Sequence, residues 1–176
     1  MDHPFSSHVF IGTSVDGFIA RTDGDIEWLV SRGEAAGDYG YDAFAAGIDT
    51  VVMGRGTYEA VVAGGWWAYD GKHVAVLSTR LDADADPRIT VYRSLEELIS
   101  GLAERGTKNV YADGGQVIQT FLRAGLIDTI TISQVPVLIG SGIPLFGPLT
   151  EDISLTHRET KVLGAGMIQT SYEVAR

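Results

Sequence analysis

The 176-residue sequence predicts a single α/β domain in which helices flank a mixed, mainly parallel central sheet with antiparallel C-terminal strands. Three observations predict this class. Short apolar runs alternate with helical patterns over the first two thirds of the chain, and period-two patterns replace them in the last third. No linker or internal repeat divides residues 1–176, and a hydrophobic content of 45% allows one full-sized core.

Four predicted strands are short, apolar and rich in β-branched residues, as is typical of strands covered on both faces of a parallel sheet. They comprise residues 8–13, 49–53, 74–77 and 109–112. Residues 16–25, between the first two of these strands, are rich in Gly and Asp and are expected to form a loop.

Three helices are predicted. Ser94 and Glu97 have the spacing of a capping box, and the apolar stripe behind them ends at Gly106. A second amphipathic stripe follows Gly115 and ends at Gly125, and a third, shorter helix is expected over residues 41–46.

The last third of the chain changes its pattern. Residues 129–135 and 168–174 alternate with a period of two, and residues 163–166 have the composition of a turn. The sequence therefore predicts antiparallel strands at the C-terminal end of the sheet.

Composition excludes several classes of function. Thirteen Lys and Arg residues against 23 Asp and Glu give a net charge of −10, which disfavours a nucleic-acid partner. The absence of cysteine excludes disulfides and thiolate metal sites, and the four histidines are isolated, so no metal site is expected. The sequence has no signal peptide and no apolar segment long enough to cross a bilayer, so a cytoplasmic protein without a membrane partner is expected.

Glycines mark two predicted strand ends that run directly into helix starts. Gly54-Arg55-Gly56-Thr57 follows one strand, and Asp113-Gly114-Gly115-Gln116 follows another. Helix starts offer free amides to an anion, and glycine lets a phosphate approach the backbone. Ser78-Thr79-Arg80 adds hydroxyls and a guanidinium at a third strand end. On the residues alone these segments also fit ordinary turns between strands and helices.

Five segments, in the order in which they occur along the chain, resemble the dihydrofolate reductase fold. The last of them is more similar to the reductase domain of riboflavin biosynthesis and its stand-alone relatives. These segments are residues 14–20, 53–57, 77–80, 113–115 and 136–146. The resemblance covers nearly the whole chain, from about Val9 onward.

The resemblance implies that NADPH lies across the carboxyl edge of the sheet. Phosphates would be bound at one helix start by Gly54, Arg55 and Thr57. The pyrophosphate would be bound at another helix start by Gly114 to Val117. Ser78, Thr79 and Arg80, with Arg55, would hold the 2′-phosphate, while Gly12 and Ile19 would line the nicotinamide. The complete cofactor-binding set comprises Gly12, Ile19, Gly54, Arg55, Thr57, Leu77, Ser78, Thr79, Arg80, Asp113, Gly114, Gly115, Gln116 and Val117.

A reductase also needs a proton source near the atom that it reduces. In dihydrofolate reductases a carboxylate on the first helix contacts the pterin ring, and Asp38 and Asp42 lie in the similar region of this sequence. Asp42 is preferred because it lies inside a predicted helix, although both fit solvent-facing carboxylates. Ser133 matches a hydroxyl position that contacts substrate in the family, but it also fits an exposed residue on the polar face of its strand.

The sequence therefore predicts an NADPH-dependent reductase that transfers hydride to a pterin-like or ribosylamino-pyrimidine-like small molecule. Two alternatives stay open: a non-catalytic nucleotide-binding or sensing module that retains the cofactor cleft, and a flavin-binding α/β protein. Dimers are common in the riboflavin branch, so a homodimer is expected. Trp66 and Trp67, adjacent in a glycine-flanked loop, are expected at a subunit contact or in a substrate lid.

Overall fold

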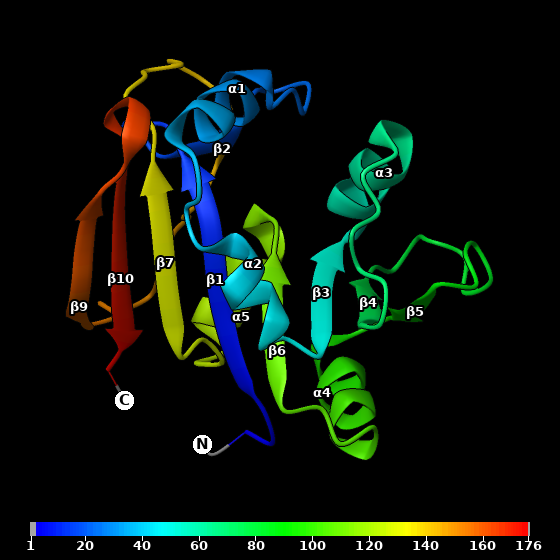
Figure 1. The fold of residues 1–176 in the computed structure, drawn as a ribbon. Helices are drawn as coiled ribbons and strands as arrows, with labels where there is room; N and C mark the ends of the chain where they lie inside the picture. Colours follow the sequence, from blue (N-terminus) through cyan, green and yellow to red (C-terminus); the bar gives the residue numbers. More distant parts are fainter. Residues whose placement is uncertain (1–2, 176) are drawn as a thin grey trace.

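An eight-stranded sheet forms the centre of the molecule (Figure 1), for which a computed structural model describes residues 3–175. Its strand order is β5-β4-β3-β6-β1-β7-β10-β9. The bounds of its strands are β1 Ser6–Thr13, β3 Thr50–Gly54, β4 His73–Leu77, β5 Ile89–Tyr92, β6 Asn109–Asp113, β7 Thr129–Gln134, β9 Leu155–Val162 and β10 Ile168–Val174. A second, two-stranded sheet pairs β2 (Phe18–Ala20) with β8 (Ile143–Pro144).

Strand pairing confirms the predicted mixed sheet. The strands β1, β3, β4, β5, β6 and β7 pair in parallel, whereas β10 pairs antiparallel with β7 and β9. Since parallel strands end at a common edge, the ends of β1, β3, β4 and β6 lie along one side of the sheet. This arrangement brings together strand ends that are far apart in the sequence.

Five α-helices connect and cover the strands (Figure 1). Their bounds are α1 Glu27–Ala36, α2 Tyr41–Ala46, α3 Arg55–Gly64, α4 Leu95–Glu104 and α5 Gly115–Arg123. The predicted capping box starts α4: the Ser94 hydroxyl accepts a hydrogen bond from the Glu97 amide at 3.1 Å. The Glu97 carboxylate accepts one from the Arg93 amide at 2.6 Å. This local chemistry fixes the start of α4 independently of the rest of the fold.

The two faces of the sheet carry separate apolar clusters. On one face, Leu98 and Leu102 of α4 and Ile118 and Phe121 of α5 are fully buried against sheet residues such as Val52. On the other face, α3 and α2 cover Val51, Met53 and their neighbours. The parallel strands are therefore buried on both sides, which explains their continuous apolar sequences.

Several elements were not predicted. The expected loop over residues 16–25 contains β2, which has only three residues and pairs with a segment more than 120 residues away. The prediction also missed α1, which begins without a side-chain cap and buries only Trp28, and the short strand β5. Trp28 lies in a small core cluster with Val135 and Met167. Such elements carry weak local signals because their partners are distant.

The outer strand β9 is exposed along its whole length. It pairs with β10 on one side and ends the strand order of the described sheet. The turn that joins β9 to β10 was predicted, and it contains Ala165 at a φ of +56°. The expected homodimer stays a prediction.

None of the helices within residues 3–175 is both long enough and apolar enough to span a membrane.

Removal of the Phe121 ring should measure how much the α5 face contributes to stability. Phe121 is 0% exposed, so we expect Phe121→Ala to lower the free energy of unfolding by about 3–5 kcal/mol in urea denaturation. Val162→Ala is the control, because Val162 is 80% exposed and should change stability by less than about 0.5 kcal/mol. Equal effects of the two substitutions would contradict this assignment of the core.

Candidate functional site

A cleft of about 940 Å³ lies along the edge where the parallel strands end. Its walls come from the α1 and β2 region on one side and from α3 on the other, which stand apart above the sheet in Figure 1. Every residue predicted to bind the cofactor lines this cleft: Gly12, Ile19, Gly54, Arg55, Thr57, Leu77, Ser78, Thr79, Arg80, Asp113, Gly114, Gly115, Gln116 and Val117. The fold thus brings the predicted set together, and what it binds stays a prediction.

Two helix starts open onto the cleft without side-chain caps. The N-cap of α3 is Gly54 and that of α5 is Gly114, and neither makes a side-chain cap hydrogen bond. The nearby start of α4, by contrast, is capped by Ser94. The first amides of α3 and α5 therefore stay available to an anion, and the helix dipoles favour negative charge at both places.

Gly114 allows these two helix starts to approach each other. It has a φ of +90°, and a Cβ atom at this position would lie 2.4 Å from Thr57 Oγ1 on α3. At Gly115 a Cβ atom would lie 2.8 Å from the Pro144 carbonyl oxygen of β8. The paired glycines therefore fit both a special backbone conformation and a crowded junction.

Three arginines line one end of the cleft. Arg55 begins α3, Arg80 follows β4, and Arg93 follows β5. The Arg93 guanidinium donates to the Ser78 carbonyl at 2.9 Å and to the Leu81 carbonyl at 2.5 Å, and so it holds the turn that carries Arg80. Arg93 was not predicted to line the cleft, because the short strand β5 that places it there was itself not predicted.

The Ser78 hydroxyl organises the same turn. Its oxygen accepts hydrogen bonds from the Arg80 amide at 3.2 Å and the Leu81 amide at 3.1 Å. The Arg55 guanidinium lies 3.8 Å from the Glu59 carboxylate on the exposed side of α3. This end of the cleft thus combines hydroxyls with guanidinium groups, a donor set suited to phosphate.

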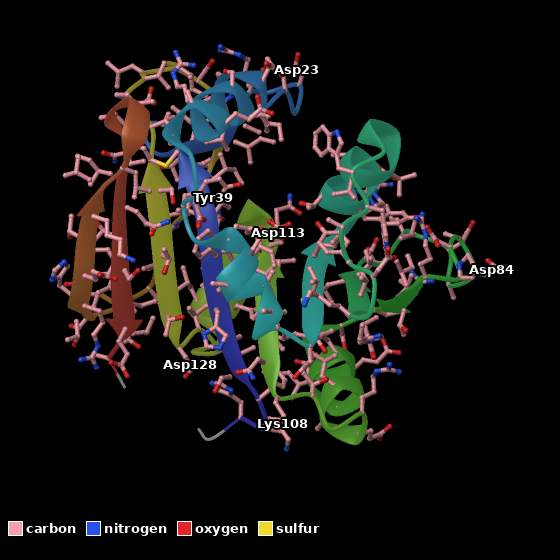
Figure 2. All side chains as sticks on the ribbon, in the orientation of Figure 1. Asp23, Tyr39, Asp84, Lys108, Asp113 and Asp128 are labelled. Atoms are coloured by element: carbon pink, nitrogen blue, oxygen red, sulfur yellow. The ribbon has the colours of Figure 1, made fainter. Side chains whose placement is uncertain are left out.

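Asp113 places a carboxyl group at the middle of the cleft. It ends β6 (Figure 2), with Met53 of β3 as its register partner, and its side chain is half-buried in the cleft wall. Burial raises the pKa of Asp113 to about 6, and the opposing effects of the Gly114 amide and the Tyr111 hydroxyl offset this only in part. A carboxyl group with this pKa exchanges a proton near neutral pH.

Tyrosines surround this carboxyl group. Tyr41, Tyr69 and Tyr111 all line the cleft, and burial raises the pKa of each hydroxyl. The negative charge of Asp113 adds to each of these increases. The phenols therefore stay protonated, and the Tyr111 hydroxyl donates to the Phe10 carbonyl at 3.1 Å.

Asp38 and Asp42, predicted as proton donors, do not line the cleft. Both are exposed, and the Asp38 carboxylate accepts a hydrogen bond from the Gly40 amide at 2.8 Å. Helical residues one position apart point in directions roughly 100° apart, so when Tyr41 faces the cleft Asp42 turns to solvent. Among the described residues, Asp113 is the one acidic side chain in the cleft wall.

Ser133 is buried, which rules out the alternative that it is an exposed residue on the polar face of its strand. It pairs in register with Gly12 on β1 and with Gln169 on β10. The Gln169 side-chain amide donates to the Ser133 hydroxyl at 2.9 Å and to the Tyr39 carbonyl at 2.8 Å. Ser133 does not line the cleft, but it supports the segment that carries Tyr39 into the wall.

The two tryptophans of the glycine-flanked loop differ in position. Trp66 lines the cleft and is 51% exposed, as a lid residue would be. Trp67 packs edge-on against Tyr69, and the Arg88 guanidinium lies 4.0 Å above its ring. Arg88 also pairs with the buried Asp86 carboxylate at 2.7 Å, so this network anchors the loop beside the cleft.

The described residues contain no cluster of three or more potential metal ligands from His, Cys, Asp and Glu side chains. The donors in the cleft are backbone amides, hydroxyls and guanidinium groups, together with one carboxyl group.

Comparison with known proteins identifies the family. The family model of the RibD C-terminal domain matches residues 8–169. The chain belongs to the RibD C-terminal domain family. Its members are reductases, and the family shares its fold with dihydrofolate reductase.

Individual relatives agree with this assignment. The Bacillus subtilis protein YwjB is 35% identical over 159 residues, which cover 89% of this chain and 91% of YwjB. A solved structure assigned to riboflavin biosynthesis, from Shewanella sp. PV-4, is 34% identical with a TM-score of 0.88 and covers 98% of this chain and 100% of that one. Dihydrofolate reductase from Enterococcus faecalis, solved with NADP(H), shares the fold with a TM-score of 0.67 at 15% identity, over 99% and 98% of the two chains.

The raised pKa of Asp113 predicts a specific dependence of stability on pH. Between pH 3.8 and about 6 the folded protein binds more protons at Asp113 than the unfolded chain does, so this contribution to stability falls as pH rises. We expect the unfolding free energy of the wild type minus that of Asp113→Asn to fall by at most about 3 kcal/mol from pH 4 to pH 7. Urea denaturation at each pH measures this difference, and a constant difference would contradict the assignment.

His73 provides a control of opposite sign. Its Nε2 atom is buried without a hydrogen-bond partner among the described residues, and burial, aided by Arg105, lowers its pKa to about 4. The unfolded chain therefore binds more protons at His73 between pH 4 and 6.5. The unfolding free energy of the wild type minus that of His73→Gln should therefore rise with pH over that interval.

Proposed function

We propose that this protein binds NADPH in the cleft and reduces a small molecule held beside it. One observation carries the proposal: two uncapped helix starts and three arginines meet in a single cleft at the carboxyl edge of the sheet. Phosphorylated dinucleotides present several separate anionic groups, and this cleft offers several separate anion-binding places.

The donor set fits the successive parts of the cofactor. Arg55, Ser78, Thr79 and Arg80 would hold the 2′-phosphate, and the amides at the starts of α3 and α5 would hold the pyrophosphate. The close approach at Gly114 supports this assignment, because a side chain there would collide with Thr57. Gly12 and Ile19 would then line the nicotinamide on the β1 side of the cleft.

Bound NADPH would supply a hydride. The protein would supply the proton, so that a C=N or C=O group, one hydride and one proton give the saturated amine or alcohol. Asp113 is the group that we assign to this step, because its carboxyl group lines the cleft and retains a proton up to about pH 6. Its carboxylate would then regain a proton from solvent, directly or through the adjacent tyrosine hydroxyls.

The substrate class that we propose follows the family. The chain is closer to the riboflavin-pathway reductases than to dihydrofolate reductase, so a ribosylamino-pyrimidine-like or pterin-like compound is proposed.

Arginine substitutions test the cofactor assignment. We expect the protein to bind NADPH more tightly than NADH, and Arg55→Ala and Arg80→Ala each to weaken NADPH binding about tenfold or more, because each removes a charge-assisted hydrogen bond. The affinity for NADH should change less, so the preference of the protein for NADPH over NADH should become smaller. Equilibrium fluorescence titration measures the dissociation constants of NADPH and NADH for the wild type and both variants, with Arg123→Ala, outside the cleft, as the control. An unchanged preference in both variants would reject the role given to these arginines.

Asp113→Asn tests the proton donor. Loss of a general acid lowers the rate of reduction by about 10²- to 10⁴-fold, whereas NADPH should still bind. Loss of NADPH absorbance measures turnover with dihydropterins and ribosylamino-pyrimidines. Wild-type protein that binds NADPH but oxidises it with none of these compounds would favour a nucleotide-sensing module over a reductase.

A further inference from the structure

Charge is distributed unevenly along the cleft. Among the described residues that line it, the charged ones are Arg55, Arg80, Arg93 and Asp113. The arginines follow β3, β4 and β5, and Asp113 is the last residue of β6. The wall at the end of β1 contains no charged side chain.

The arginines follow strands that lie two or more strand spacings from this uncharged end. In the order β4-β3-β6-β1, about 10 Å separates β3, which precedes Arg55, from β1, and about 14 Å separates β4, which precedes Arg80, from β1. Residues Ile11, Gly12, Ile26 and Leu29 form the wall there, and Leu29 fills the space above Gly12. This half of the cleft is therefore apolar and uncharged.

Basic residues that precede or flank this wall are engaged elsewhere. The Arg21 guanidinium lies 3.5 Å from the Asp25 carboxylate, and Arg32 donates to the Trp28 carbonyl at 2.8 Å. Lys72 precedes β4 and so lies at the opposite edge of the sheet, where it donates to the carbonyls of Ala45 and Ile48, the latter at 2.7 Å. None of these three side chains lines the cleft.

Aromatic rings complete this half of the cleft. Tyr39 and Tyr41 come from the segment after α1, and both rings pack on Phe10 of β1, at centroid distances of 6.3 and 5.9 Å. Tyr111 supports Tyr41 from β6 at 6.4 Å. Rings that are held in this way offer flat surfaces to a planar ligand.

A substrate phosphate at this end would be buried without a cation. The nearest charged group across the cleft would be the Asp113 carboxyl, which repels an anion when it is ionised. Burial of an unpaired charge is costly, so this half of the cleft selects against anionic substrates.

We propose that the substrate half of the cleft binds planar aromatic or heteroaromatic compounds that carry no phosphate or carboxylate. This inference rests on the proposed reductase function, because it assigns the arginine end to the cofactor. This substrate specificity distinguishes the protein from any reductase whose substrate must carry a 5′-phosphate in order to bind.

Two matched pairs of compounds test the inference. The first is 5-amino-6-ribosylaminouracil and its 5′-phosphate, and the second is dihydrobiopterin and dihydrofolate, whose glutamate part carries carboxylates. Calorimetric titration into the protein, with and without saturating NADP⁺, measures binding. In at least one pair we expect the uncharged member to bind about tenfold or more tightly than its anionic partner.

Ile26→Arg supplies the missing cation, with Ile26→Gln as the uncharged control. We expect Ile26→Arg to improve binding of the anionic members about tenfold, and Ile26→Gln to leave the preference unchanged. Denaturation in urea checks that both variants fold. Equal or tighter binding of the anionic member in both pairs by the wild type, or binding of none of the four compounds, would overturn the inference. A parallel NADPH titration separates this failure from failure of the proposed function, since NADPH would still bind in the first case.

Discussion

Parallel pairing of β1, β6, β3 and β4 is the constraint on which the site depends. Backbone hydrogen bonds fix Met53 beside Asp113 and Gly54 beside Leu77, so segments from separate parts of the chain end at one edge. The helices α3 and α5 begin there, and glycine at each N-cap leaves their first amides unpaired by side chains. A sheet with any of these strands reversed would separate the two helix starts and lose the cleft.

The chemistry of the cleft changes from one end to the other. Guanidinium groups and hydroxyls gather where β3, β4 and β5 end, one carboxyl group lies at the middle, and apolar and aromatic side chains form the β1 end. Figure 2 shows Asp113 and Tyr39 at the cleft edge of the sheet, whereas Lys108 and Asp128 lie at the opposite edge. This gradient suits a ligand that is anionic at one end and neutral at its reactive end.

The sequence predicted the proposed cofactor half of the cleft better than the proposed substrate half, for a physical reason. Glycines and hydroxyls at strand ends are local signals, and parallel pairing then brings them together, as it does Gly54, Ser78 and Gly114. The substrate half depends on α1, β2 and the orientation of Tyr41, which are set by contacts between distant segments. Asp42 was therefore preferred over Asp38 as the proton donor, and Asp113 was predicted only to bind the cofactor, because its burial could not be inferred from its position beside two glycines.

A crystal structure with NADPH bound is the most direct test of this account. It should show the pyrophosphate in contact with backbone amides at the starts of both α3 and α5, and the nicotinamide on the β1 side of Asp113. A nucleotide that contacts only one of these helix starts, or that lies outside the cleft, would contradict the central claim that one dinucleotide spans both helix starts in this cleft.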